Sequence, residues 1–153
     1  MEIKAELQKP YTEKQRIDFI VLNNHQRGYE IRETDEALQA WGYTEEEIEQ
    51  KEQERIAQLH LTRGDVFRGL LMARQVTRAQ IRALIEQMPD TTPEQAIAKE
   101  YALIDFDESL DFYRGVALIE TLGLQLGISS EAMTQFFETN DWHYLIPDTR
   151  EVE

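Results

Sequence analysis

The sequence contains no cysteine among its 153 residues, which excludes disulfide bonds, zinc–thiolate sites and thiol catalysis. It also lacks long hydrophobic runs, and no stretch approaches the roughly 20 apolar residues that span a bilayer. The first residues, MEIKAELQKPYTEKQ, contain no apolar segment of the kind found in signal peptides. We therefore expect a cytoplasmic protein without membrane contacts.

Basic residues are scarce, because 16 Lys and Arg stand against 30 Asp and Glu, giving a net charge of −14 and a pI of about 4.6. This excess of negative charge would repel both nucleic acids and anionic membranes, so it argues against a general binder of either. Hydrophobic residues make up 41% of the chain, which is enough for a buried core and excludes wholesale disorder.

Catalytic motifs are absent as well. The sequence contains no GxSxG nucleophile elbow, no HExxH pair and no glycine-rich phosphate loop. Its histidines are isolated from one another: His25, His60 and His143. We accordingly predict a protein that is not an enzyme and uses no cofactor.

A cluster of carboxylates is the best candidate for a metal site: Asp105, Asp107, Glu108 and Asp111. Clustered carboxylates suit Ca²⁺ or Mg²⁺, but this segment lacks the glycine and the distal glutamate of an EF-hand loop. Acidic clusters are also typical of solvated faces. We favour the solvated face and predict no metal site, with a metal-dependent enzyme as the alternative.

Helix starts are the clearest structural signal. Five threonines are each followed three residues later by Gln, Glu or Asp, as in a capping box: Thr12, Thr44, Thr62, Thr77 and Thr92. Ser129 is a sixth start, and Gly28, Gly42, Gly115 and Gly127 stand where helices should end. We identify no sustained two-residue alternation, so we predict an all-α fold of seven or eight short helices in a small orthogonal bundle.

The predicted organisation has three parts. Residues 1–60 form an N-terminal helical part, in which Ala37, Leu38 and Trp41 share one side of a short helix and about 45–59 is a highly charged, exposed helix. Residues 61–146 form a C-terminal helical bundle, and 147–153 a flexible tail. The apolar periodicity predicts the core of the bundle from these residues: Val66, Phe67, Leu70, Leu71, Ile81, Leu84, Ile85, Ile97, Tyr101, Leu118, Leu122, Leu126, Met133, Phe136 and Phe137.

Positive charge is concentrated in residues 63–85, which contain five arginines and a single acidic residue, Asp65. The arginines are Arg63, Arg68, Arg74, Arg78 and Arg82. They suit a docking surface for an acidic partner, since arginine binds carboxylates in a bidentate manner. They also suit internal pairing with the strongly acidic residues 86–153, which we favour because an intramolecular acid is always at high effective concentration.

The same segment matches a helix-turn-helix in its lengths, with helices at about 66–74 and 78–88. Arg78 and Arg82 would face outward on the second helix. The acidic surface elsewhere would be repelled by DNA, so we do not favour nucleic acid as a partner.

Two aromatic residues, Trp41 and Tyr43, bracket Gly42. Large aromatic side chains are common in a hydrophobic core, and they also anchor protein partners when they are exposed. Together with the five arginines, Trp41 and Tyr43 are our predicted partner-binding residues.

Two long stretches of the sequence carry a resemblance: KPYTEKQRIDFIVLNNHQRGYEIRETDEALQAWGYTEEE and YRGVALIETLGLQLGISSEAMTQFFE. They resemble small phage- and prophage-encoded proteins of uncharacterised function. Proteins of this kind are encoded among tail and lysis genes, so the resemblance implies a phage origin and carries over no catalytic residue. We therefore predict a non-enzymatic accessory protein that acts through protein–protein contacts, in tail assembly or as a minor virion component.

The predicted location is then the host-cell cytoplasm or the virion, and a homo-oligomer is compatible with the charge pattern. The alternative is an acidic regulator that engages DNA, or that mimics DNA in order to bind a host DNA-binding protein.

Overall fold

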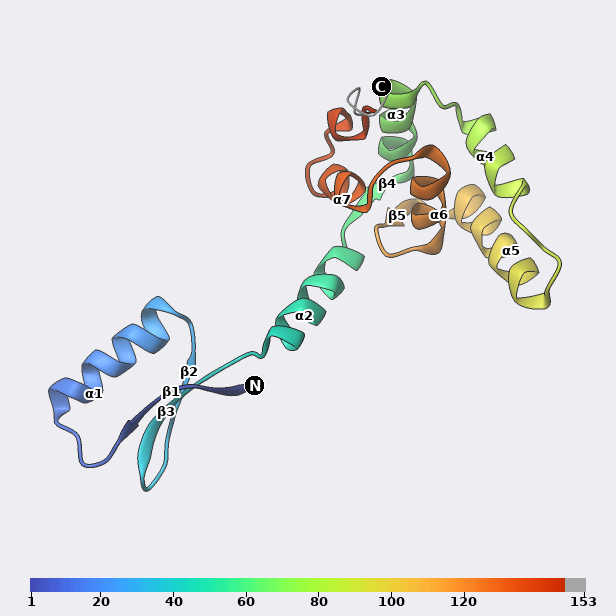
Figure 1. Cartoon of the computed structure of the whole chain (residues 1–153). Coiled ribbons are helices and arrows are strands. Elements are labelled where there is room, and N and C mark those ends of the chain that lie inside the picture. Colours follow the sequence, from blue (N-terminus) through green and yellow to red (C-terminus); the bar gives the residue numbers. More distant parts are fainter. Residues whose placement is uncertain (148–153) are drawn as a thin grey trace, which may run out of the picture. The chain divides into compact units, whose positions relative to one another are not determined.

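The computed structural model, which describes residues 1–147, contains both helices and strands (Figure 1). The all-α prediction is therefore wrong, because two small antiparallel sheets are present. The chain divides into two units, Met1–Gln53 and Glu54–Glu153. Their border lies inside helix α2 (Glu45–Ala57), whereas the sequence suggested a border after residue 60. Apart from Pro147, the predicted tail lies outside the described residues.

Unit 1, Met1–Gln53, is built around a three-stranded sheet with strand order β1-β3-β2. Its elements are β1 (Glu2–Gln8), α1 (Glu13–Ile20), β2 (Glu30–Glu33) and β3 (Ala37–Gly42). Both outer strands pair antiparallel with β3, and a register shift marks a bulge in β1 between Ile3 and Ala5. Helix α1 continues into a π-helical turn, Val21–Gln26, which leads back to β2.

The predicted short helix at Ala37, Leu38 and Trp41 is a strand instead. Ala and Leu favour helices locally, but β3 hydrogen-bonds to a strand on each side, and this pairing overrides the local preference. The signal for β1 was present in the sequence, since the apolar residues of EIKAELQ alternate with polar ones. Gly42 accordingly ends a strand rather than a helix.

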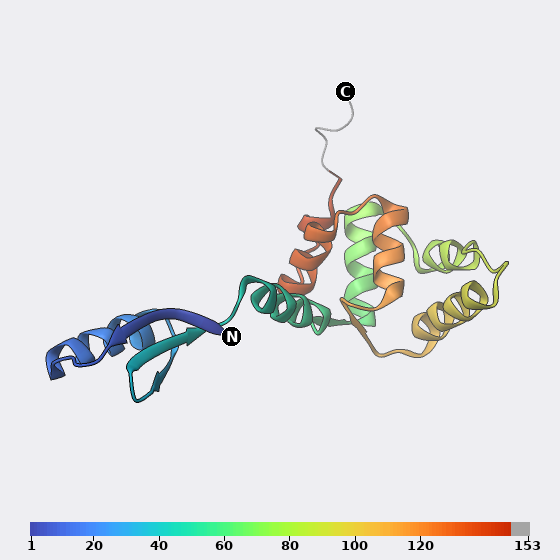
Figure 2. The same cartoon turned by 60° about the horizontal axis from the view of Figure 1, so that its bottom comes forward.

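Unit 2 is mostly helical within the described residues. Its elements after α2 are β4 (His60–Thr62), α3 (Arg63–Arg74), α4 (Arg78–Glu86), α5 (Pro93–Glu108), β5 (Asp111–Tyr113), α6 (Ala117–Leu126), α7 (Ser130–Thr139) and a 3₁₀ turn, Trp142–Leu145. Strands β4 and β5 form a two-stranded antiparallel ladder. Figure 2 shows α4 and α5 side by side, in agreement with their contacts.

The predicted helix starts are confirmed. Thr12, Thr77 and Thr92 form complete capping boxes with glutamines three residues later. Thr44 exchanges the same two bonds with Glu47, while Thr62 and Ser129 each accept one backbone hydrogen bond. Gly127 ends α6 in the left-handed region at φ 67°, whereas Gly115 does not end a helix and precedes α6 instead.

One cluster of buried residues forms the core of unit 2. Its members are Val66, Leu70, Ile81, Ile85, Ala102, Phe106, Phe112, Leu118, Ile119, Leu122, Ile128, Met133, Phe136, Phe137 and Leu145. Three residues expected in this core are exposed instead: Leu71, Ile97 and Tyr101. The prediction failed for these residues because periodicity identifies apolar faces without showing which face a neighbour covers.

A buried arginine joins β5 to the helices that follow it. Arg114 is 4% exposed and pairs with the carboxylate of Glu120. Its guanidinium also donates to the hydroxyl of Thr134 (3.2 Å) and to the hydroxyl (2.9 Å) and carbonyl oxygen (3.2 Å) of Ser130. Several acceptors satisfy this charge, as burial of an arginine requires.

Candidate functional site

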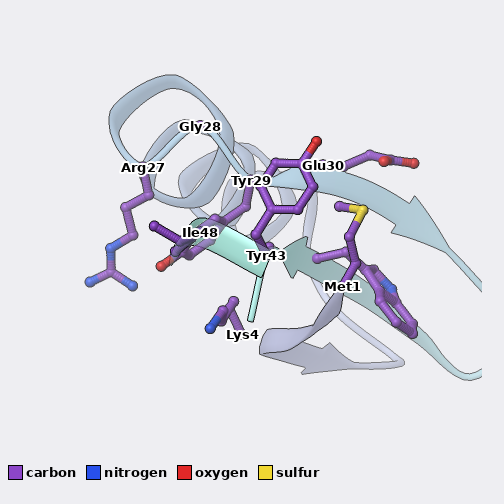
Figure 3. Close-up of a pocket in the computed structure, with 10 residues that line it drawn as sticks. Met1, Lys4, Arg27, Gly28, Tyr29, Glu30, Tyr43 and Ile48 are labelled. Carbon is purple, nitrogen blue, oxygen red and sulfur yellow. The ribbon is translucent and has the colours of Figure 1, made fainter. Parts of the chain in front are cut away.

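A pocket of about 360 Å³ opens at one end of the sheet in unit 1. Figure 3 shows Met1, Tyr29, Tyr43 and Ile48 gathered around it, each from a different segment of the chain. The ten lining residues are Met1, Lys4, Arg27, Gly28, Tyr29, Glu30, Trp41, Gly42, Tyr43 and Ile48. The pocket thus contains the predicted Trp41–Tyr43 corner.

Tyr29 is positioned by the tight connection between the π-helical turn and β2. Gly28 adopts a φ of +73°, which glycine tolerates without strain. The amide of Tyr29 then donates to the carbonyl of Asn23 (2.8 Å), and the side chain of Asn24 donates to the carbonyl of Tyr29 (2.7 Å). The ring lies directly over Gly42, where an added Cβ would approach Tyr29 carbons to 2.9 Å. Only glycine at residue 42 leaves room for this ring.

Trp41 is half-buried and held in place by polar neighbours on β3 and β1. Its indole Nε1 donates to Gln39 Oε1 (3.1 Å), and Gln39 Nε2 donates in turn to Glu6 Oε2 (2.7 Å). The guanidinium of Arg32 lies 4.7 Å from the centre of a Trp41 ring, within the range of a cation–π interaction. Trp41 therefore presents a rigid aromatic surface.

An ion pair with Glu30 helps to hold Arg32 over the Trp41 ring, because Arg32 Nε donates to Glu30 Oε1 at 2.9 Å. This hydrogen bond lowers the pKa of the Glu30 carboxyl below its usual value. Glu30 is thus an anion on the pocket wall at neutral pH.

Tyr43 is the more accessible aromatic residue of the corner. Its side chain is 42% exposed, and Lys51 Nζ lies 3.8 Å from the ring centre. The capping box of Thr44 and Glu47 starts α2 directly after Tyr43 and brings Ile48, which is 54% exposed, to the pocket. An exposed aromatic beside an exposed aliphatic side chain is a surface that a partner can bury.

The lining of the pocket combines apolar, aromatic and charged side chains. It includes no serine, cysteine or histidine, and its titratable side chains are those of Lys4, Arg27, Tyr29, Glu30 and Tyr43. Aromatic and aliphatic carbon forms much of the wall, while Lys4, Arg27 and Glu30 supply charges of both signs.

Four of the five predicted arginines bind groups within unit 2, and three of them bind groups in residues 86–153. Arg63 Nη1 donates to the carbonyl of Asp107 at 2.6 Å, near the end of α5. Arg74 donates to the carbonyls of Leu126 (2.9 Å) and Leu145 (2.6 Å), and burial lowers the pKa of its guanidinium. These acceptors lie in residues 86–153, the segment with which the sequence suggested internal pairing.

Arg82 pairs with the carboxylate of Asp107 and, at 3.2 Å, with Glu86. The other two arginines are exposed. Arg68 pairs with Asp65 at 2.7 Å, one turn away on α3. Arg78 makes no hydrogen bond or ion pair with any residue from 1 to 147, which leaves its charge facing solvent. The five arginines belong to unit 2, whereas Trp41 and Tyr43 belong to unit 1.

The acidic cluster around Asp105 does not converge. Asp107 pairs with Arg82, and Asp105 accepts a hydrogen bond from Ser109 at 3.4 Å. Within residues 1–147, no three Asp, Glu, His or Cys side chains are grouped so that they could hold a metal ion.

Tyr29 and Ile48 line the pocket but were not identified from the sequence. The signal for Tyr29 was its position between Gly28 and the first residue of β2, Glu30. Ile48 stood in a highly charged segment, where a single apolar residue suggests little. Asn23, whose carbonyl accepts the hydrogen bond from the Tyr29 amide, is buried, and its Oδ1 has no hydrogen-bond partner among residues 1–147.

The chain matches no protein-family model, no curated protein and no solved structure. None of the helices formed by residues 1–147 is long and apolar enough to cross a membrane.

Proposed function

We propose that this chain is a non-enzymatic phage or prophage accessory protein that acts through protein–protein contacts, in tail assembly or as a minor virion component. The contact surface is the Trp41–Tyr43 corner with its pocket. The observation that carries the proposal is the pocket of about 360 Å³, in which exposed Tyr43 and Ile48 stand beside a rigidly held Trp41.

The chemistry of the pocket supports a protein partner. Aromatic anchors of restricted mobility lose little conformational entropy on binding, and they dominate the energetics of many protein interfaces. Arg27 at the pocket can pair with a carboxylate of a partner, which gives the contact specificity, whereas Lys4 already pairs with Glu2.

Affinity capture from a lysate of induced lysogenic cells tests this proposal. The tagged chain is compared with a Tyr43→Ala variant, and retained proteins are identified by mass spectrometry. Tyr144→Ala is a matched control, since Tyr43 and Tyr144 are each 42% exposed. We expect tail or baseplate proteins to be retained by the original chain and by Tyr144→Ala, but lost from Tyr43→Ala.

Both substitutions are at exposed positions, so the helical content measured by circular dichroism should not change. Retention of the same proteins by Tyr43→Ala, with its fold intact, would remove the corner from the contact surface. Failure to retain any phage protein would contradict a role in assembly.

The alternative function, an acidic regulator that binds DNA-binding proteins of the host, is favoured by the net charge of −14. The same capture experiment distinguishes the two. A mimic of DNA should retain host nucleoid proteins, polymerase or nucleases at low salt and release them as salt rises, because its binding is electrostatic. Contact through an aromatic pocket should depend on salt only weakly.

A further inference from the structure

Helix α5 leaves a stripe of large apolar side chains uncovered on one face. Ile97, Tyr101 and Ile104 are 56%, 65% and 42% exposed. Their spacing of four and three residues places them in line along the helix. The other side of α5 carries the buried Ala102 and Phe106, through which the helix joins the core of unit 2. We call the three exposed residues the α5 stripe.

Carboxylates surround the α5 stripe. By helical spacing, Glu94 and Glu108 lie at its two ends, and Glu100 lies beside it. These three glutamates make no ion pair within residues 1–147. The single basic residue of the helix, Lys99, pairs instead with Asp90 at 3.1 Å and has a side chain only 20% exposed. The stripe is therefore apolar in the middle, with glutamates at both ends and along one side, while Arg82 pairs with Asp107 near the end of the helix.

The apolar stripe and its flanking glutamates together favour a binding partner that carries positive charge. A second copy of α5 would bring two sets of carboxylates against each other, and juxtaposed like charges oppose association. A helix with an apolar face and flanking Lys or Arg side chains would cover the stripe and pair with the glutamates. Residues at spacings of four and three are the usual anchors when one helix docks along another.

We propose that the α5 stripe binds a basic amphipathic helix of a partner protein. This surface belongs to unit 2 and shares no residue with the Trp41–Tyr43 corner of unit 1. The chain then has two separate contact surfaces, each on its own unit, and can connect two partners. The inference does not rest on the corner, and each surface is tested by its own variants.

The test uses the full chain and a fluorescent peptide of about 18 residues, or five helical turns, with Leu along one face and Lys elsewhere. Binding is followed by fluorescence anisotropy. Two control peptides are a scrambled version of identical composition, which has no apolar face, and a version with Glu in place of Lys. We expect the basic amphipathic peptide to bind at least about tenfold more tightly than either control.

Variants locate the binding on α5. The double substitution Ile97→Ala/Tyr101→Ala should weaken binding of the basic peptide about tenfold, since it removes two central anchors. Leu124→Ala is the matched control, because Leu124 is 82% exposed on α6, and it should change the affinity by less than about twofold. Tyr43→Ala should also have no effect, which separates this surface from the corner.

Equal binding of the scrambled peptide would overturn the proposal, because it would show a general attraction of Lys to an acidic protein. So would unchanged binding by Ile97→Ala/Tyr101→Ala. A second copy of the chain is the other molecule that could cover the α5 stripe, and sedimentation of the chain alone tests for it. Self-association that is abolished by Ile97→Ala/Tyr101→Ala would identify a second copy as the partner and would also overturn the proposal.

Discussion

Arg74 shows how a residue expected to bind a partner serves the fold. Its guanidinium donates to the carbonyls of Leu126 and Leu145, each the last residue of a helical element. The final carbonyls of a helix have no partner within the helix, so an external donor is needed. We expect Arg74→Ala to lower the free energy of unfolding by about 2 kcal/mol, because it leaves these carbonyls without that donor. Urea denaturation measures this loss.

Arg78 provides the matched control four residues further along the chain. It is exposed and makes no pair with residues 1–147, and it stands at the first position of α4, where a positive charge opposes the helix dipole. Arg78→Ala should therefore change the free energy of unfolding by less than about 0.5 kcal/mol. Equal losses in the two variants would show that the carbonyl contacts of Arg74 do not stabilise the protein.

At the scale of the element, the packing of α3 against α7 depends on one glycine. A Cβ added at Gly69 would lie 2.5 Å from the ring of Phe136, which is 1% exposed and has little room to move. Alanine favours a helix over glycine by about 1 kcal/mol, but the overlap costs more. We expect Gly69→Ala to lower the free energy of unfolding by about 1–2 kcal/mol, as measured by urea denaturation.

A substitution at Gly123 in α6 separates the effect of helix propensity from the effect of steric overlap. A Cβ there would meet the carbonyl of Ile128 at 3.4 Å and the methyl group of Met133 at 3.6 Å, which are ordinary contacts. Gly123→Ala should therefore leave the stability unchanged or raise it by up to about 1 kcal/mol through helix propensity. A stabilising Gly69→Ala would contradict the close packing of α3 on Phe136.

At the scale of the whole molecule, two effects change the melting temperature in opposite directions as the pH falls. One is the loss of the net charge of −14, and the other is the protonation of carboxylates whose pKa values are lowered in the folded protein. Protonation toward the pI of about 4.6 reduces repulsion between like charges and should raise the melting temperature. The hydroxyl of Tyr11, and then Lys9, lower the pKa of Glu33, while Arg68 and then the Thr62 hydroxyl lower that of Asp65.

A carboxylate whose pKa is lower in the folded state contributes stability above its unfolded pKa, and this contribution is lost as the pH falls through the folded value. We therefore expect the melting temperature to rise or hold between pH 7 and about 5 and to fall below about pH 4. Calorimetry across this pH range measures the melting temperature. The substitution Glu33→Gln should make the acid decline shallower, and a melting temperature that keeps rising below about pH 4 would contradict the carboxylate contacts.

The sequence by itself determined where α1, α2, α3, α4, α5 and α7 begin, but not α6, whose N-cap Val116 makes no side-chain hydrogen bond. Each cap joins a Thr or Ser hydroxyl to a backbone amide three residues ahead, so all the information lies within four consecutive residues. The same locality made Trp41 and Tyr43 recognisable as neighbours. Strands β4 and β5 could not be found in this way, because they pair with each other across a long stretch of chain. Strand β3 pairs with the nearby β2 but also with the distant β1.

Only the tertiary structure decided which arginines bind acceptors within the protein and which apolar faces are covered. Helix α5 has apolar residues on two sides, and periodicity alone could not show that Phe106 is buried while Ile97 and Tyr101 stay exposed. In the same way, the choice between internal and external partners for Arg74 depended on the ends of α6 and the 3₁₀ turn, which lie 52 and 71 residues away. Burial and long-range pairing depend on which elements meet, and that is settled when the whole chain folds.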